Sequence, residues 1–160
     1  MKKHNIEPIF SSDSKVLILG SFPSVISRNK GFYYANKNNR FWKTIFTLLS
    51  ESMCEDNETK KEILLKHRIA LWDVVKSCEI TGSRDNTIHD ITVNDIDGLL
   101  KKTDITAIFL NGKTAEKLFD KYLKKSINIP SFYLPSTSSA NAHYRESDLT
   151  DSWKVILEHL

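Results

Sequence analysis

This chain has 160 residues, of which 40% are hydrophobic, enough for one domain with a buried core and too few for two comfortable domains. Cys54 and Cys78 are its only cysteines, which excludes a disulfide framework and, because no CxxC pair is present, a cysteine-rich zinc site. The formal charge of +3 would suit a polyanionic partner but is too small to identify one.

Apolar runs bounded by polar residues predict buried strands, and apolar residues three and four positions apart predict helices that face a core. In chain order, these patterns predict a strand at 15–19, helices at 40–51 and 57–67, a strand at 69–75, a long loop or insertion at 78–92, a helix at 94–102, a strand at 105–110, a helix at 113–125, a strand at 129–134 and a helix at 149–160.

Strands that alternate with helices indicate parallel pairing, because the connection between two parallel strands has to cross over the sheet. The sequence therefore predicts an α/β fold: a three-layer sandwich with a central, mostly parallel sheet of about four strands and helices on both faces. Residues 1–160 are expected to form this single domain. Ligands of such sheets bind beyond the carboxyl ends of the strands. Polar loops begin at four of these predicted ends, at Gly20, Asp73, Asn111 and Pro135, so we expect one shared crevice.

The first of these loops, residues 20–42, combines aromatic rings with amides. Its rings are Phe32, Tyr33 and Tyr34, and its amides are Asn36, Asn38 and Asn39. A nucleobase can stack on an aromatic face for about 1–3 kcal/mol, and an amide can both donate and accept hydrogen bonds at a base edge. Taken alone, the run is more typical of an Asn-rich turn with buried aromatic residues. The three other loops at the same edge favour a base site.

The second and third loops each begin with one polar side chain. Asp73 could hydrogen-bond the edge of a purine or cap a helix or turn. Taken alone, the residue favours neither role over the other. Asn111 could contact the ligand, but a role in holding neighbouring loops in register is favoured. The histidines are expected at the surface or on helices and are given no role: His4, His67, His89 and His159.

The fourth loop is rich in small hydroxyl side chains. Its polar residues after Pro135 are Ser136, Thr137, Ser138, Ser139 and Asn141. Small hydroxyls beside backbone amides suit a DNA phosphate, and contacts of this kind fix register without reading sequence. The segment by itself is also typical of a flexible, Ser-rich surface loop.

Five sequence blocks in this order, GSFPS, YYANKNNRFW, LWDVV with CEITGSRD, FLNGKTA and LPSTSSANA, resemble the hypoxanthine-DNA glycosylase family of the uracil-DNA glycosylase superfamily. The resemblance extends from about Val16 to Ala142. It implies a monofunctional DNA glycosylase that flips a deaminated base, chiefly hypoxanthine, out of DNA. Attack of water then hydrolyses the N-glycosidic bond and initiates base excision repair, with uracil or xanthine as further candidate substrates.

The resemblance also implies roles for individual residues. Many superfamily members place a catalytic Asp or Asn in the first loop, whereas GSFPS has neither, so the catalytic residue is predicted to be Asn39 in the NNRFW block. Its amide would orient the attacking water or contact the leaving base. The predicted base pocket consists of Ser21, Phe22, Tyr33, Tyr34, Asp73 and Asn111. The predicted DNA-backbone loop consists of Ser136, Thr137, Ser138, Ser139 and Asn141.

Two other classes of protein stay open. One is a non-catalytic module that binds damaged or single-stranded DNA, and the other is a nucleoside hydrolase or deoxyribosyltransferase that acts on free deoxynucleosides. The Ser-rich loop favours a polymeric substrate. We expect DNA containing deaminated bases as the partner, no cofactor or metal, and a monomer. No apolar run approaches the roughly 20 residues that span a bilayer, and no signal peptide is evident, so a cytoplasmic location without membrane attachment is expected.

Overall fold

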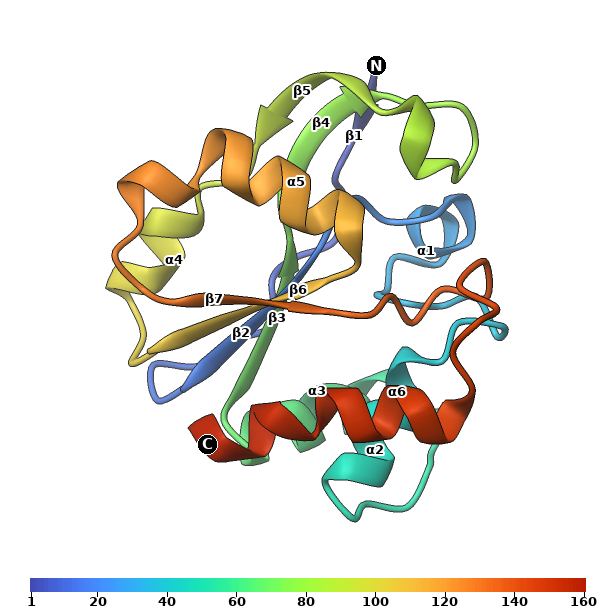
Figure 1. The fold of residues 1–160 in the computed structure, drawn as a ribbon, viewed down its shortest axis with the longest axis vertical. Helices are drawn as coiled ribbons and strands as arrows, with labels where there is room; N and C mark the ends of the chain where they lie inside the picture. Colours follow the sequence, from blue (N-terminus) through green and yellow to red (C-terminus); the bar gives the residue numbers. More distant parts are fainter.

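A four-stranded parallel sheet runs through the centre of the computed structural model, which describes residues 1–160 (Figure 1). Its strands are β2 (Val16–Gly20), β3 (Ile69–Asp73), β6 (Ala107–Asn111) and β7 (Ser131–Leu134). They lie in the order β3-β2-β6-β7, and every neighbouring pair is parallel. The predicted α/β fold with a four-stranded parallel sheet is confirmed.

Helices cover both faces of this sheet (Figure 1). They are α2 (Phe41–Leu48), α3 (Asn57–Lys66) and α6 (Glu146–Trp153) on one face, and α4 (Ile96–Lys101) and α5 (Lys113–Tyr122) on the other. Successive side chains of a strand point to opposite faces, so Ile18 packs into the first layer and Leu19 into the second. Because both faces are buried, the strands read as continuous apolar runs in the sequence.

The order of the strands creates a crevice at one edge of the sheet. The chain passes from β2 to β3 on one side and then crosses to β6 on the other side of β2. The connections at the carboxyl ends of β2 and β6 therefore diverge, and this divergence is where open α/β sheets bind ligands. In Figure 1 the short helix α1 (Val25–Lys30) and the loop after β7 gather at this edge.

A second sheet, which the sequence patterns did not predict, extends the structure. It is antiparallel, in the order β1-β4-β5, and consists of β1 (Lys2–Lys3), β4 (Val75–Glu79) and β5 (His89–Val93). The predicted strand 69–75 is wrong at its end, because the parallel strand stops at Asp73 and β4 begins two residues later. The predicted loop 78–92 is wrong as well, since it is mostly a hairpin with a short 3₁₀ turn, η1 (Asp85–Thr87).

The hairpin escaped prediction because β5 is a polar edge strand. None of its five residues is fully buried, so it lacks the apolar alternation that marks a half-buried strand. The helical predictions differ at their ends only. The C-terminal helix α6 begins three residues early and continues as 3₁₀ turns η3 (Lys154–His159), and α5 is followed by η2 (Lys124–Ser126). None of the helices has the length and apolar composition that crossing a membrane requires.

The central strand should dominate the stability of the fold. Ile18 is fully buried in β2, so Ile18→Ala is expected to lower the free energy of unfolding by about 2–5 kcal/mol through lost burial and a residual cavity. Ile26 of α1 is 39% exposed, and Ile26→Ala should change the same quantity by only about 0.5 kcal/mol. Urea unfolding of both variants measures this difference. Equal losses would contradict the assignment of the core.

Candidate active site

A cleft of about 730 Å³ lies beyond the carboxyl ends of the parallel strands. All twelve residues predicted for the site border it, from the four loops after β2, β3, β6 and β7. The register of the sheet explains this convergence, because Gly20 pairs with Asp73 and Asn111 pairs with Leu134, so the strands end together. Their side chains nevertheless differ in what they can offer a ligand.

Asn39 presents hydrogen-bond donors to the cleft. Its Oδ1 accepts the backbone N–H of Phe41 at 2.9 Å, at the start of α2. A backbone N–H can only face the oxygen of an amide, so this bond fixes which way the amide is turned. The Nδ2 group forms no hydrogen bond within the protein. Asn39 is partly exposed and therefore offers two free N–H donors at the cleft wall.

The two tyrosines of the first loop have different surroundings. The ring of Tyr33 is 2% exposed, contacts His4 and Phe32, and its hydroxyl donates to the backbone carbonyl of Glu7 at 2.9 Å. Tyr33 therefore has no free face for a base, which corrects its predicted stacking role. Tyr34 stacks one face on Phe41, with 4.2 Å between ring centroids, and borders the cleft. Tyr34 is the remaining candidate for base stacking.

The floor of the cleft is formed where β2 meets β3. A Cβ atom on Gly20 would lie 2.5 Å from Asp73 Oδ1 and 2.8 Å from the Tyr34 hydroxyl, so these two polar atoms flank one small volume. Only glycine leaves that volume free. Asp73 Oδ1 has no hydrogen-bond partner in the protein although the residue is only 4% exposed. Burial, and next the charge of Asp73, raises the pKa of Tyr34, so its hydroxyl stays protonated.

Asn111 ties the third and fourth loops together. Its Nδ2 donates to the Tyr34 hydroxyl and to Thr137 Oγ1, both at 3.1 Å, and its Oδ1 accepts the Thr137 backbone N–H at 3.1 Å. This is the loop-holding arrangement that the sequence favoured for Asn111. Thr137 is fully buried, so its hydroxyl does not face the DNA and its predicted backbone-contact role is corrected.

Arg40, which the sequence analysis gave no role, holds the fourth loop. Its guanidinium donates to the backbone carbonyls of Ser138 at 2.9 Å, Asn141 at 3.1 Å and Tyr144. The Arg40 backbone N–H donates to the Thr137 carbonyl at 3.0 Å. The loop is therefore braced rather than loose. A sequence pattern could not reveal this, because the acceptors are backbone carbonyls about 100 positions away.

The bracing leaves few groups of the fourth loop free to meet DNA. Ser136 and Ser138 use their hydroxyls to accept backbone N–H groups within the loop, and Asn141 donates its amide to the Ser136 carbonyl. Ser139 is exposed, and neither its hydroxyl nor its backbone N–H has a partner in the protein. Among the predicted loop residues, Ser139 is best placed to contact a phosphate.

A buried, hydrogen-bonded pair of side chains lies behind the floor of the cleft. His4 Nε2 is 2.8 Å from Asp73 Oδ2, with side-chain exposures of 3% and 5%. His4 Nδ1 accepts the backbone N–H of Ile6, so Nε2 carries the proton that is donated to Asp73. The prediction that His4 lies at the surface without a role is wrong. The N-terminal segment passes under the sheet edge, where Ile9 pairs with Leu71, and no local pattern signals that path.

Ser21 and Phe22 complete the first loop. Ser21 Oγ lies 3.1 Å from each carboxylate oxygen of Asp85, on the β4–β5 hairpin. Phe22 is 7% exposed and packs edge-on against His4, with the Arg28 guanidinium 5.3 Å from its ring centroid. Phe22 therefore supports the wall of the cleft and has little surface to offer a base.

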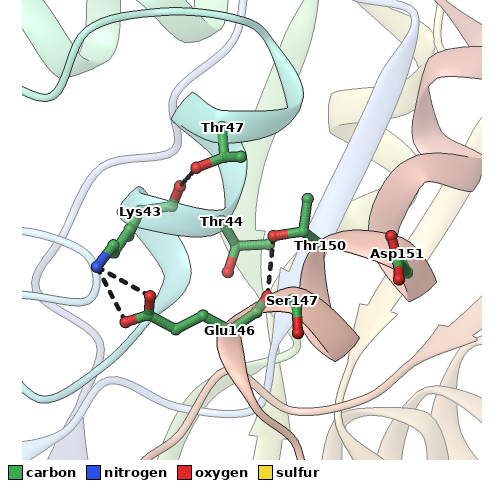
Figure 2. Close-up of a pocket in the computed structure, with 7 residues that line it drawn as sticks. All are labelled: Lys43, Thr44, Thr47, Glu146, Ser147, Thr150 and Asp151. Carbon is green, nitrogen blue, oxygen red and sulfur yellow. Dashed lines mark hydrogen bonds and ion pairs between the residues drawn. The ribbon is translucent and has the colours of Figure 1, made fainter.

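A smaller hollow of about 310 Å³ lies between α2 and α6, away from the cleft (Figure 2). Its lining is polar, and two of its hydroxyls bond to the carbonyl one turn earlier in their own helix: Thr47 to Lys43 and Thr150 to Glu146. Lys43 and Glu146 form an exposed ion pair across it. The hollow contains no aromatic ring and none of the predicted residues, so the cleft is the candidate active site.

The fold and the cleft together define an α/β protein with one polar, aromatic-walled site at the carboxyl edge of its sheet. The family model of the uracil DNA glycosylase superfamily matches residues 7–160, and the chain belongs to this superfamily. This confirms the family that the five sequence blocks predicted, and DNA glycosylase is the class of activity that the findings support.

Relatives and a solved structure agree with this assignment. A protein of Methanosarcina acetivorans named hypoxanthine DNA glycosylase is 32% identical, covering 99% of this chain and 100% of the relative. One of Methanosarcina barkeri with the same name is 29% identical over 88% and 89% of the two chains. A solution NMR structure from M. acetivorans, of a protein assigned to the uracil DNA glycosylases, has a TM-score of 0.81 at 33% identity and covers 98% of this chain and 99% of the other.

The buried pair beneath the cleft should be important for stability. His4→Ala removes the donor to Asp73 and leaves a buried carboxylate without its partner, which is expected to cost about 3 kcal/mol of unfolding free energy. His89 is exposed, and His89→Ala should change this quantity by about 0.5 kcal/mol or less. Urea unfolding at neutral pH compares the two variants. A His4 variant as stable as the wild type would show that the pair contributes nothing.

Proposed function

We propose that this protein excises hypoxanthine from DNA by flipping the deaminated nucleotide into the cleft and hydrolysing the bond between the sugar C1′ and the base. Both Methanosarcina relatives carry the name of this activity. One structural observation supports it most directly. Of the three asparagines predicted at the site, Asn111 donates both amide N–H groups inside the protein and Asn141 donates one, whereas Asn39 keeps both free.

The geometry of Asn39 favours one of its two predicted roles. A glycosidic bond breaks with both electrons moving to the base, so negative charge develops on the leaving purine while the sugar becomes oxocarbenium-like. Asn39 Oδ1 already accepts the Phe41 N–H, whereas both N–H groups of its amide are unpaired. We therefore assign Asn39 to hydrogen bonding with the departing base rather than to accepting a proton from water. A fixed donor of this kind needs no reorganisation as the charge develops.

The floor of the cleft fits the edge that deamination creates. Hypoxanthine presents an N1–H donor beside a C6 carbonyl acceptor, whereas adenine presents an acceptor beside an amino group. Asp73 Oδ1 can only accept when ionised, and the Tyr34 hydroxyl, which already accepts from Asn111, has its own proton left to donate. These atoms flank the same volume above Gly20. The pair matches hypoxanthine and opposes adenine, and the corresponding edge of uracil has the same pattern.

The walls of the cleft suit a flipped nucleotide. The face of Tyr34 that is not stacked on Phe41 would receive the base, and Ser139 on the braced fourth loop would contact the DNA backbone. Flipping costs a few kcal/mol and is least costly at a mispaired base, which itself contributes selectivity. Preorganisation of the loop by Arg40 reduces the entropy that binding would otherwise lose.

Asn39→Ala should abolish hypoxanthine excision while leaving binding to deoxyinosine-containing DNA largely intact. Loss of one oriented donor to a developing anion is expected to lower the single-turnover rate by about 100-fold or more. The matched control is Asn38→Ala, because Asn38 is the exposed neighbour and its side chain makes no hydrogen bond. A fluorescence-labelled oligonucleotide, cleaved with alkali at the abasic product, measures the rate. Full activity of the Asn39 variant would overturn its assignment.

A panel of substrates separates the proposed function from the other two classes. Oligonucleotides with one hypoxanthine, uracil, xanthine or adenine, in single and double strands, are incubated beside free deoxyinosine. We expect base release from hypoxanthine in DNA, none from adenine and none from the free nucleoside. Binding without alkali-sensitive sites would indicate a non-catalytic module, and release from free deoxyinosine would indicate a nucleoside hydrolase.

A further inference from the structure

Asp85 is the second carboxylate that borders the cleft, beside Asp73 at the floor. It starts the 3₁₀ turn η1 on the β4–β5 hairpin, 64 positions from Ser21, whose hydroxyl donates to its carboxylate with 3.1 Å to each oxygen. No other hydrogen bond and no ion pair involves this carboxylate. Its remaining lone pairs are free on the side of the cleft.

The hairpin holds Asp85 in place through contacts with α1 and within its own turn. The backbone N–H of Val25 donates to Ser83 Oγ at 2.9 Å, and Arg28 donates to the carbonyl of Gly82. Thr87 closes the turn by donating to the Arg84 carbonyl at 2.6 Å. Asp85 thus lies in an exposed loop while its carboxylate turns inward to the GSFPS turn at residues 20–24, which has no acid or amide of its own.

The surroundings of this carboxylate disfavour its charged form. Burial in the cleft raises the pKa of Asp85, the Ser21 hydrogen bond lowers it, and the negative charge of Asp73 raises it further. Two carboxylates share the cleft, and only Asp73 accepts a hydrogen bond from His4. A cationic sugar at the mouth of the cleft would compensate the second one, because a base that reaches the floor at Gly20 leaves its deoxyribose near the rim.

We propose that Asp85 is a catalytic residue that faces C1′ of the flipped nucleotide, stabilises the oxocarbenium-like sugar and accepts a proton from the attacking water. The inference rests on the proposed function. The C1′–N9 bond breaks with its electron pair leaving on the base, and the water oxygen bonds to C1′. The proton of that water passes to Asp85 and then to solvent, and the released base takes a proton from solvent. Ser21 acts as a positioning residue that keeps Asp85 ionised.

Asp85 has to be ionised to act, so the rate should fall at acidic pH. The titratable and charged groups of the cleft and hairpin near it are Asp73, Tyr34, Cys78, Arg84, Arg28 and Lys113, with His4 behind Asp73. The acid limb of the pH–rate profile, where the rate falls, is therefore assigned to Asp85 by comparing variants and not from the midpoint of the fall.

The test is the single-turnover rate of hypoxanthine release from duplex DNA between about pH 4 and pH 9, in wild type and three variants. Asp85→Asn should lower the neutral-pH rate about 100-fold or more and remove the acid limb. Ser21→Ala removes a hydrogen bond to the ionised form, so it should move the acid limb to higher pH. Asp90→Asn, an equal change of charge on the same hairpin, should behave as wild type.

Thermal unfolding shows whether the variants fold and provides a second readout. Because the pKa of Asp85 is raised on folding, its charge destabilises the folded protein above that pKa, and the cost disappears as the pH falls below the ordinary value. Asp85→Asn should therefore raise Tm at neutral pH while lowering activity. An Asp85 variant with the wild-type rate and acid limb overturns the inference. Failure of the wild type to release hypoxanthine would instead overturn the proposed function.

Discussion

The register of the parallel sheet determines where every functional side chain of this protein lies. Gly20 is paired with Asp73, and β6 and β7 end alongside at Asn111 and Leu134, so four loops begin at one level. A slip of one residue would turn each strand over and exchange its two buried faces, which the apolar packing on both sides forbids. The two packed layers thus fix the site as well as the fold.

Within that frame the cleft is kept rigid by hydrogen bonds that join distant loops. The Arg40 guanidinium donates to three carbonyls of the fourth loop, and Asn111 donates to Thr137 and to Tyr34. Their function is preorganisation, since groups that are already ordered lose little entropy on binding. Asn39 differs from both because only its oxygen is tied down.

The electrostatics of the cleft are asymmetric. Asp73 at the floor has a histidine behind it, whereas Asp85 at the mouth has one hydroxyl and no cation. The floor can therefore keep a fixed hydrogen-bonding pattern for the edge of a base. The mouth retains a carboxylate without an ion-pair partner in the region where the proposed reaction makes the sugar positive. Unfavourable charges of this kind commonly accompany catalytic sites, where stability is lower than it could be.

The sequence alone determined the parallel sheet, the four converging loops, the family and the residues that border the cleft, because apolar periodicity and the ends of strands are local properties of the chain. Tertiary structure decided what those residues can do. It buried Tyr33 and Thr137, turned the donors of Asn39 toward the cleft, and brought in three residues that the sequence left unassigned: His4, Arg40 and Asp85. For His4, Arg40 and Asp85 the physical reason is that their hydrogen bonds depend on partners 64 to 104 positions away, which no local pattern encodes.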